Sequence, residues 1–78
     1  MKFRKSTKKN KKYDAILNDG SIVSFGQIGY QQYKDNALGL YKDLDHLDPK
    51  RRDLFKKRFE KTRHVKYSPS WFSSRFLW

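Results

Sequence analysis

The sequence predicts a small α+β domain in which a β-hairpin precedes two short helices and a docked C-terminal tail. Three features predict this fold. Two alternating segments flank an Asn-Asp-Gly turn at 18–20, an Asp-Pro pair at 48–49 opens a helical pattern, and an aromatic-rich segment ends the chain. A chain of 78 residues is sufficient for one domain only, since a domain of this size buries only about 60% of its unfolded surface.

The predicted hairpin consists of strands at 12–17 and 21–26. Alternation places Tyr13 and Ala15 on one face of the first strand and Phe25 on a face of the second. The residues between the strands tolerate the positive φ angles that tight turns require. We therefore expect these two strands to form the scaffold of the domain.

Helical segments are predicted after the hairpin. The tyrosine spacing at 30–33 is consistent with one helical turn, and the apolar spacing at 40–47 predicts a short amphipathic helix. A longer helix should begin at Asp48 and Pro49, because Asp accepts hydrogen bonds from the free N–H groups of a first turn and Pro fits the first helical position. We expect this helix to end near Thr62.

The C-terminal segment is rich in aromatic residues. Ser68 and Pro69 can begin one or two final helical turns. Large apolar side chains are costly to leave in water, and the chain has no disulfide or metal to stabilise it. We expect four aromatic side chains to complete the core against the hairpin and the basic helix: Trp71, Phe72, Phe76 and Trp78.

Basic residues give the chain a net charge of +11, with 19 Lys and Arg against 8 Asp and Glu. Residues 1–12 contain seven cations and no acid, residues 13–48 carry a net charge of −4, and residues 49–66 carry +7. Uncompensated cations at this density cannot pack a core, so residues 1–11 are predicted to be a flexible basic arm before a folded domain at 12–78. The arm is interpreted either as a solubilising tail or, preferably, as a polyanion-binding segment that releases counterions from phosphate. Its candidate binding residues are Lys2, Arg4, Lys5, Lys8, Lys9, Lys11 and Lys12.

The basic helix offers two further sets of cations. At 100° per residue, Arg51 and Arg58 fall in the apolar sector of the helix. One interpretation is structural, with the guanidinium groups stacked on a C-terminal tryptophan and paired with an acid; the other is a recessed pair that faces phosphate or an acidic partner. A second cluster lies outside the apolar sector and is predicted to bind a polyanion or an acidic protein surface: Arg52, Lys56 and Arg63.

Several classes of function are disfavoured. Without cysteine, the chain can form no disulfide, thiolate metal cluster or thiol nucleophile. No apolar run approaches the roughly 18–20 residues of a membrane span. His46 and His64 are the only histidines, and no cysteine accompanies them as a zinc ligand. We therefore predict a protein that is not an enzyme and has no metal, cofactor or small-molecule substrate, with His46 in a structural role between two helices.

Four segments of the chain form a distinctive succession: SFG (24–26), YQQYKD (30–35), HLDPKRRDLFKKRFEK (46–61) and FSSRFLW (72–78). This succession resembles a family of small uncharacterised basic proteins from large double-stranded DNA viruses of algae and amoebae and from some marine phages. The family pairs a short hairpin with an H-x-D-x-x-R-R segment, an aromatic-x-x-Arg step and an aromatic stretch that ends in Leu-Trp. Phe59 stands where the family pattern has histidine. The resemblance covers residues 12–78 and leaves the basic arm outside.

The resemblance implies a viral setting without implying an activity. Our leading hypothesis is a non-enzymatic virion component that bridges capsid proteins and the packaged genome, present in the host nucleus or cytoplasm during assembly. The alternative is a nucleic-acid-binding module without sequence preference. A third hypothesis is a protein that binds an acidic host protein.

Overall fold

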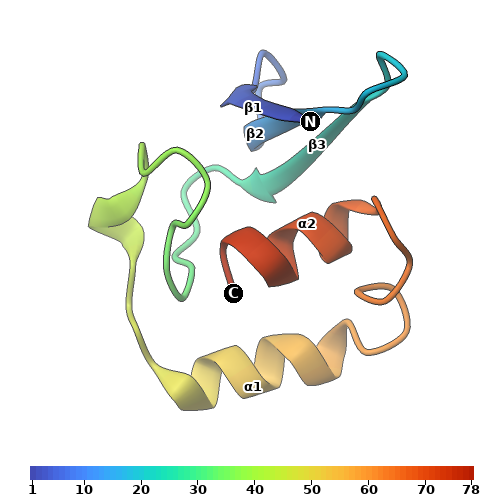
Figure 1. The fold of residues 1–78 in the computed structure, drawn as a ribbon. Coiled ribbons are helices and arrows are strands. Elements are labelled where there is room, and N and C mark those ends of the chain that lie inside the picture. The colour runs from blue at the N-terminus through green and yellow to red at the C-terminus, as the bar shows by residue number, and fades with distance from the viewer.

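A computed structural model describes all residues, 1–78, as one α+β unit. Its sheet, the helix α2 and the helix α1 lie one below another in Figure 1, with α2 between the other two. This arrangement confirms the predicted fold class. The elements are β1 (Lys2–Lys5), β2 (Lys11–Ile16), β3 (Ile22–Gln27), the 3-10 helix η1 (Lys42–Leu44), α1 (Pro49–Arg58) and α2 (Pro69–Phe76).

The three strands form an antiparallel sheet in the order β1-β2-β3. Strands β2 and β3 form the predicted hairpin, and their register places Tyr13 opposite Phe25 and Ala15 opposite Val23. Its turn is closed by the N–H of Leu17, which donates to a carbonyl oxygen four residues later at 2.8 Å. The alternating pattern therefore predicted the hairpin correctly.

Strand β1 corrects the prediction of a flexible arm at residues 1–11. It pairs with β2, and Phe3 lies opposite Ala15. The Phe3 ring packs against Phe25, with 5.8 Å between ring centroids, and against Phe76 at 4.7 Å. Charge density suggested disorder, but pairing with β2 and the packed Phe3 ring hold this strand on the core.

The core lies between the sheet and α2. Its buried side chains are Tyr13, Ala15, Phe25, Phe72 and Leu77. Gly26 allows the C-terminal segment to approach the sheet closely, because a Cβ atom there would lie 2.8 Å from Leu77 Cδ1. The Trp78 ring stacks on Phe55 of α1 at 4.5 Å between centroids. The predicted docking of the aromatic tail against hairpin and helix is thus confirmed.

The helices differ from the prediction in extent. The Asp48 carboxylate caps α1 as predicted, by accepting from the N–H of Lys50 at 3.0 Å. The helix ends at Arg58 instead of Thr62, and the chain then turns back toward α2. Only η1 is helical within 40–47, and none of 30–33 is helical. No helix has the length and apolar character required to cross a bilayer.

Buried polar side chains hold the irregular segment between β3 and α1 in place. Gln32 donates through Nε2 to the Tyr41 carbonyl oxygen at 2.7 Å and to the Asp45 carboxylate at 2.6 Å. The Asp35 carboxylate accepts from the Tyr13 hydroxyl at 2.5 Å and from three backbone N–H groups, those of residues 37, 39 and 41. Burial, with the hydrogen bond to Asp35, raises the pKa of Tyr13, which keeps its hydroxyl a proton donor. These polar contacts replace the helix that tyrosine spacing suggested.

His46 lies between this segment and the helices, as its predicted structural role requires. Its Nδ1 accepts from the N–H of Asp48 at 2.9 Å, and its ring lies 5.1 Å from the Trp78 ring. Its Nε2 is buried and has no hydrogen-bond partner. Burial lowers the pKa of His46, and Arg51 lowers it further, while Asp48 and Asp45 oppose the shift.

We expect this histidine to make the fold sensitive to mild acid. Because the folded pKa is lowered, the unfolded state binds more protons below about pH 6.5, and stability falls as the pH drops through that value toward the folded pKa. Protonation of Nδ1 would also remove the acceptor for the N–H of Asp48. Thermal midpoints measured between about pH 7.5 and 5.5 should therefore decrease, and less steeply in His46→Gln.

His64→Gln is the matched control for this experiment, because the His64 side chain is 61% exposed. It should retain the wild-type pH profile. If the thermal midpoint of His46→Gln falls as steeply with decreasing pH as that of the wild type, then His46 is not the group responsible for the acid sensitivity.

Candidate functional site

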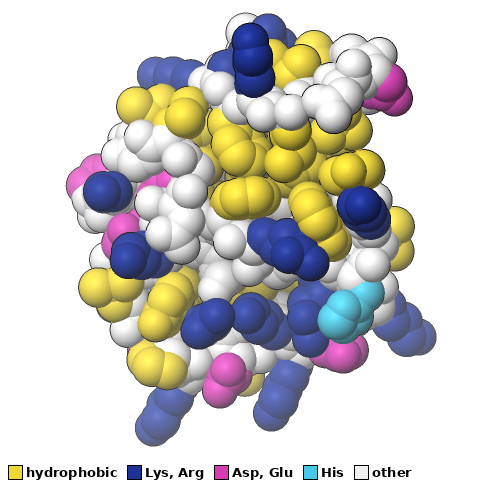
Figure 2. Space-filling view, viewed as in Figure 1, with side chains coloured by type: hydrophobic (Ala, Val, Ile, Leu, Met, Phe, Trp, Pro, Cys, Tyr) yellow, Lys and Arg dark blue, Asp and Glu magenta, His cyan; other side chains and the backbone are white.

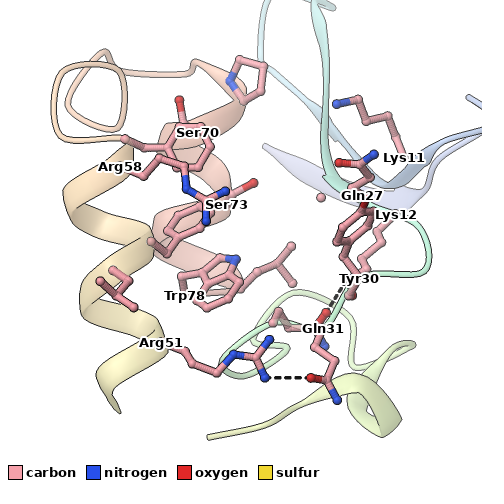
Figure 3. Close-up of a pocket in the computed structure, with 17 residues that line it drawn as sticks. Lys11, Lys12, Gln27, Tyr30, Gln31, Arg51, Arg58, Ser70, Ser73 and Trp78 are labelled. Atoms are coloured by element: carbon pink, nitrogen blue, oxygen red, sulfur yellow. Dashed lines mark hydrogen bonds between the residues drawn. The ribbon is translucent and has the colours of Figure 1, made fainter. Parts of the chain in front are cut away.

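A groove of about 650 Å³ lies between α1, α2 and one end of the sheet. In Figure 3, Arg51 and Arg58 extend from α1 on one side, Lys11, Gln27 and Tyr30 lie on the other, and Trp78 lies between them. The groove is lined by Lys11, Lys12, Gly26, Gln27, Tyr30, Gln31, Gln32, Arg51, Leu54, Phe55, Arg58, Phe59, Pro69, Ser70, Ser73, Leu77 and Trp78.

The walls of the groove carry positive charge only. Four of its residues are Lys or Arg, and none is Asp or Glu. Arg51 and Arg58 are exposed and form no ion pair. Arg51 donates through Nη1 to Gln31 Oε1 at 2.7 Å, and Arg58 lies against the Phe59 ring at 5.8 Å. The structure therefore places both arginines beside a groove. The tryptophan stacking considered for them does not occur. Arg75, which the sequence did not single out, stacks on Trp71 instead.

The groove also presents aromatic and hydrogen-bonding side chains. Its aromatic residues are Tyr30, Phe55, Phe59 and Trp78. Gln27, Ser70 and Ser73 line it with side chains that form no hydrogen bond within the protein. Their donors and acceptors are thus available to a ligand.

Lys12 was predicted to bind a polyanion, and the structure contradicts that prediction. Its side chain is 1% exposed, and its Nζ donates to the Tyr30 carbonyl oxygen at 2.6 Å and to Gln32 Oε1. Burial lowers the pKa of Lys12, and the nearby Asp35, Asp45 and Asp43 oppose this shift. Lys12 therefore supports the back of the groove and is not available to a polyanion.

Arg4 and Arg52 also have structural partners. Arg4 donates through Nε to the Asp14 carboxylate at 3.1 Å. Burial alone would raise the pKa of Asp14, but hydrogen bonds from Ser6, Ser24 and Arg4 outweigh it and hold that pKa below its ordinary value. Arg52 donates to the Trp78 carbonyl oxygen at 2.8 Å and lies 4.9 Å from the Tyr33 ring centroid.

The remaining cations of β1 and its turn stay exposed. They are Lys2, Lys5, Lys8 and Lys9, and Lys11 follows them at the edge of the groove. The N–H of Lys11 donates to the Lys8 carbonyl oxygen at 3.3 Å, which ties this lysine-rich turn to the groove wall. The predicted basic segment is thus folded but keeps most of its charge on the surface.

A second basic cluster lies between α1 and the other side of α2. It forms a hollow of about 260 Å³ lined by Lys56, Arg63, His64, Trp71, Ser74 and Arg75. Burial lowers the pKa of Lys56, and the charges of Arg52 and Arg63 lower it further. Glu60 partly neutralises the cluster, because its carboxylate accepts from Arg63 Nη2 at 2.9 Å.

Few of the cations are neutralised within the protein. Of the 19 Lys and Arg residues, only Arg4 and Arg63 lie within 4.0 Å of a carboxylate. Figure 2 shows a row of basic side chains across the lower part of the molecule, where α1 lies in Figure 1. The structure brings no three His, Asp or Glu side chains together as a metal site. The exposed Lys and Arg side chains are the groups that could bind a negatively charged partner.

Sequence reasoning missed the groove's other wall. Tyr30, Gln27 and Gln31 were not singled out, because two glutamines and a tyrosine carry no charge signal. The sequence signal for this wall was the glycine at position 29, which indicates a turn just before Tyr30. In the structure Gly29 has a φ of 85°.

Comparison with known proteins gives one match. Residues 1–37 match a family of unknown function (DUF5754). The matched residues include the whole sheet and the segment that carries Tyr30 and Gln31. No curated protein and no solved structure matches the chain.

Proposed function

We propose that this protein is a non-enzymatic nucleic-acid-binding protein without sequence preference, and that the groove is its binding surface. One observation carries this proposal: a groove with three accessible cations, Lys11, Arg51 and Arg58, and no acid is also lined by aromatic rings, amides and hydroxyls. Cations bind the phosphate backbone of nucleic acids, while aromatic rings and amides contact bases.

The distribution of charge supports the same function. Seventeen of the Lys and Arg residues have no Asp or Glu carboxylate within 4.0 Å, and all of these except the buried Lys12 can displace counterions from phosphates. The lysine-rich turn at 8–11 extends the basic surface beyond the groove. Nothing in this arrangement selects a base sequence, because phosphate contacts carry no sequence information.

Removing three groove cations should weaken binding strongly. In Lys11→Gln/Arg51→Gln/Arg58→Gln the fold should persist, because none of the three forms an ion pair. Each lost phosphate contact costs about 0.7 log units in affinity for a single strand near 0.1 M salt, so the triple variant should bind about 100-fold more weakly. Fluorescence anisotropy with a labelled oligonucleotide measures this loss.

A variant of equal net charge controls for general electrostatics. Lys50→Gln/Lys57→Gln/Lys61→Gln removes three exposed cations that do not line the groove. It should lose less than about tenfold in affinity. Equal losses in the two triple variants would mean that overall charge, and not the groove, binds the nucleic acid.

A place in a virus particle is the setting that the resemblance implies for this function. There the protein would contact the packaged genome through the groove, while capsid proteins would be its second partner. Binding of an acidic protein instead of nucleic acid is the competing proposal, and it predicts weak oligonucleotide binding at every salt concentration.

A further inference from the structure

Tyr30 differs from every other aromatic residue of the chain. The sequence has 13 Phe, Tyr and Trp residues, and twelve of them pack against another aromatic ring with centroids no more than 6.3 Å apart. Tyr30 has no ring partner and no cation over its face, and its hydroxyl forms no hydrogen bond. Its side chain is 63% exposed at the edge of the basic groove.

Hydrogen bonds anchor the backbone from which this exposed ring projects. The buried Lys12 donates through Nζ to the Tyr30 carbonyl oxygen at 2.6 Å, and the N–H of Tyr30 donates to the carbonyl oxygen of Gln27 at 3.3 Å. In Figure 3, Tyr30 lies beside Gln27 and Lys11 on the wall opposite Arg51 and Arg58. A planar ring is thus presented between cations from two walls.

We infer that the groove takes single-stranded nucleic acid in preference to duplex, with one base stacked on the Tyr30 ring. This inference rests on the proposed function. Base faces are accessible in a single strand, whereas in a duplex they are stacked on one another and only edges and phosphates are presented. Tyr30 and the free amide of Gln27 would therefore have no partner on an intact duplex.

The charges on both walls fit this occupant. A base on Tyr30 places its flanking phosphates toward Lys11 on one side and toward the arginines of α1 on the other. A duplex is a stiff rod, so it would contact the rims of the groove and leave the ring unused. An acidic peptide could satisfy the cations but has no general need for an exposed aromatic face.

The test compares two ligands and three variants of the whole chain. The ligands are an oligonucleotide of about 20 residues in mixed sequence and the duplex of the same sequence. Tyr30→Ala should bind the single strand about tenfold more weakly, since stacking on one aromatic ring contributes about that factor, and should bind the duplex as the wild type does. Tyr30→Phe keeps the ring and should retain single-strand affinity.

Leu38→Ala is the matched control, because it also removes an exposed apolar side chain and lies outside the groove. It should bind both ligands as the wild type does. All variants should melt at the wild-type temperature, since the Tyr30 ring has no contact partner among the aromatic side chains.

The two proposals fail in different ways. Equal affinity for single strand and duplex, with Tyr30→Ala unchanged, would overturn the stacking role and leave the nucleic-acid function standing. Absence of salt-dependent binding to either ligand would overturn both. Single-strand preference that survives Tyr30→Ala would overturn Tyr30 as the stacking residue.

Discussion

Deletion of residues 76–78 is expected to unfold the domain. Leu77 is 1% exposed in the core, Phe76 packs on Phe3, and Trp78 stacks on Phe55. Burying each large apolar side chain contributes about 1.5–3 kcal/mol, so losing three of them approaches the roughly 5–15 kcal/mol that stabilises a whole domain. Circular dichroism should show no cooperative thermal transition in the truncated chain.

The deletion also removes two backbone acceptors. The carbonyl oxygens of Phe76 and Leu77 accept from the N–H groups of Asn36 and Lys34 at 2.8 and 3.0 Å, which ties the irregular segment to the core. Leu38→Ala, at an exposed position, should change stability by less than about 0.5 kcal/mol. A truncated chain that melts at the wild-type temperature would mean that these three residues do not stabilise the fold.

Asp35→Ala is expected to cause the second largest loss of stability. The carboxylate is 3% exposed and accepts from the Tyr13 hydroxyl and three backbone N–H groups. Alanine would leave these donors without an acceptor, and each buried unsatisfied donor costs about 1–3 kcal/mol. Allowing for relaxation of the loop, we expect a loss of about 3 kcal/mol or more in urea denaturation.

Asp43→Ala is the control for this variant. Asp43 is exposed in η1 and accepts no hydrogen bond from a side chain or cap, so its loss should change stability by less than about 0.5 kcal/mol. Similar midpoints for Asp35→Ala and Asp43→Ala would show that the buried carboxylate does not hold the segment in place.

The parts of the fold that the sequence predicted correctly are those determined by local chemistry. The alternation on either side of the Asn-Asp-Gly turn predicted the hairpin of β2 and β3, and the Asp48-Pro49 pair predicted the start of α1. The apolar tail could be placed on the core because no other position could keep Trp71, Phe72 and Phe76 out of water. Each of these predictions depends on neighbours in the sequence or on hydrophobicity alone.

The parts that were missed depend on contacts between distant residues. Phe3 anchors β1 only because Phe25 and Phe76 meet there, so the charge of its neighbours was misleading. Gln32 and Asp35 fix the segment before α1 through side chains and backbone far apart in the chain. The charge-based interpretation included Lys12 because it could not show that this lysine points inward.

The same limits apply to the candidate site. Arg51 and Arg58 were singled out from the sequence as a pair, and both line the same groove. Their place in the apolar sector of the helix suggested burial, whereas α1 packs through Phe55 and leaves both arginines exposed. Tyr30 could be recognised only after its lack of a ring partner was visible in three dimensions.

The salt dependence of single-strand binding tests the groove most directly. Anisotropy titrations of the wild type and of Lys11→Gln/Arg51→Gln/Arg58→Gln would run from about 50 to about 300 mM salt. The wild-type plot of log K against log salt should have a slope near −2, as phosphate contacts to Lys11, Arg51 and Arg58 require, and the slope of the variant should be shallower by about two. Equal slopes for the two proteins, or weak binding at every salt concentration, would contradict a nucleic-acid-binding groove.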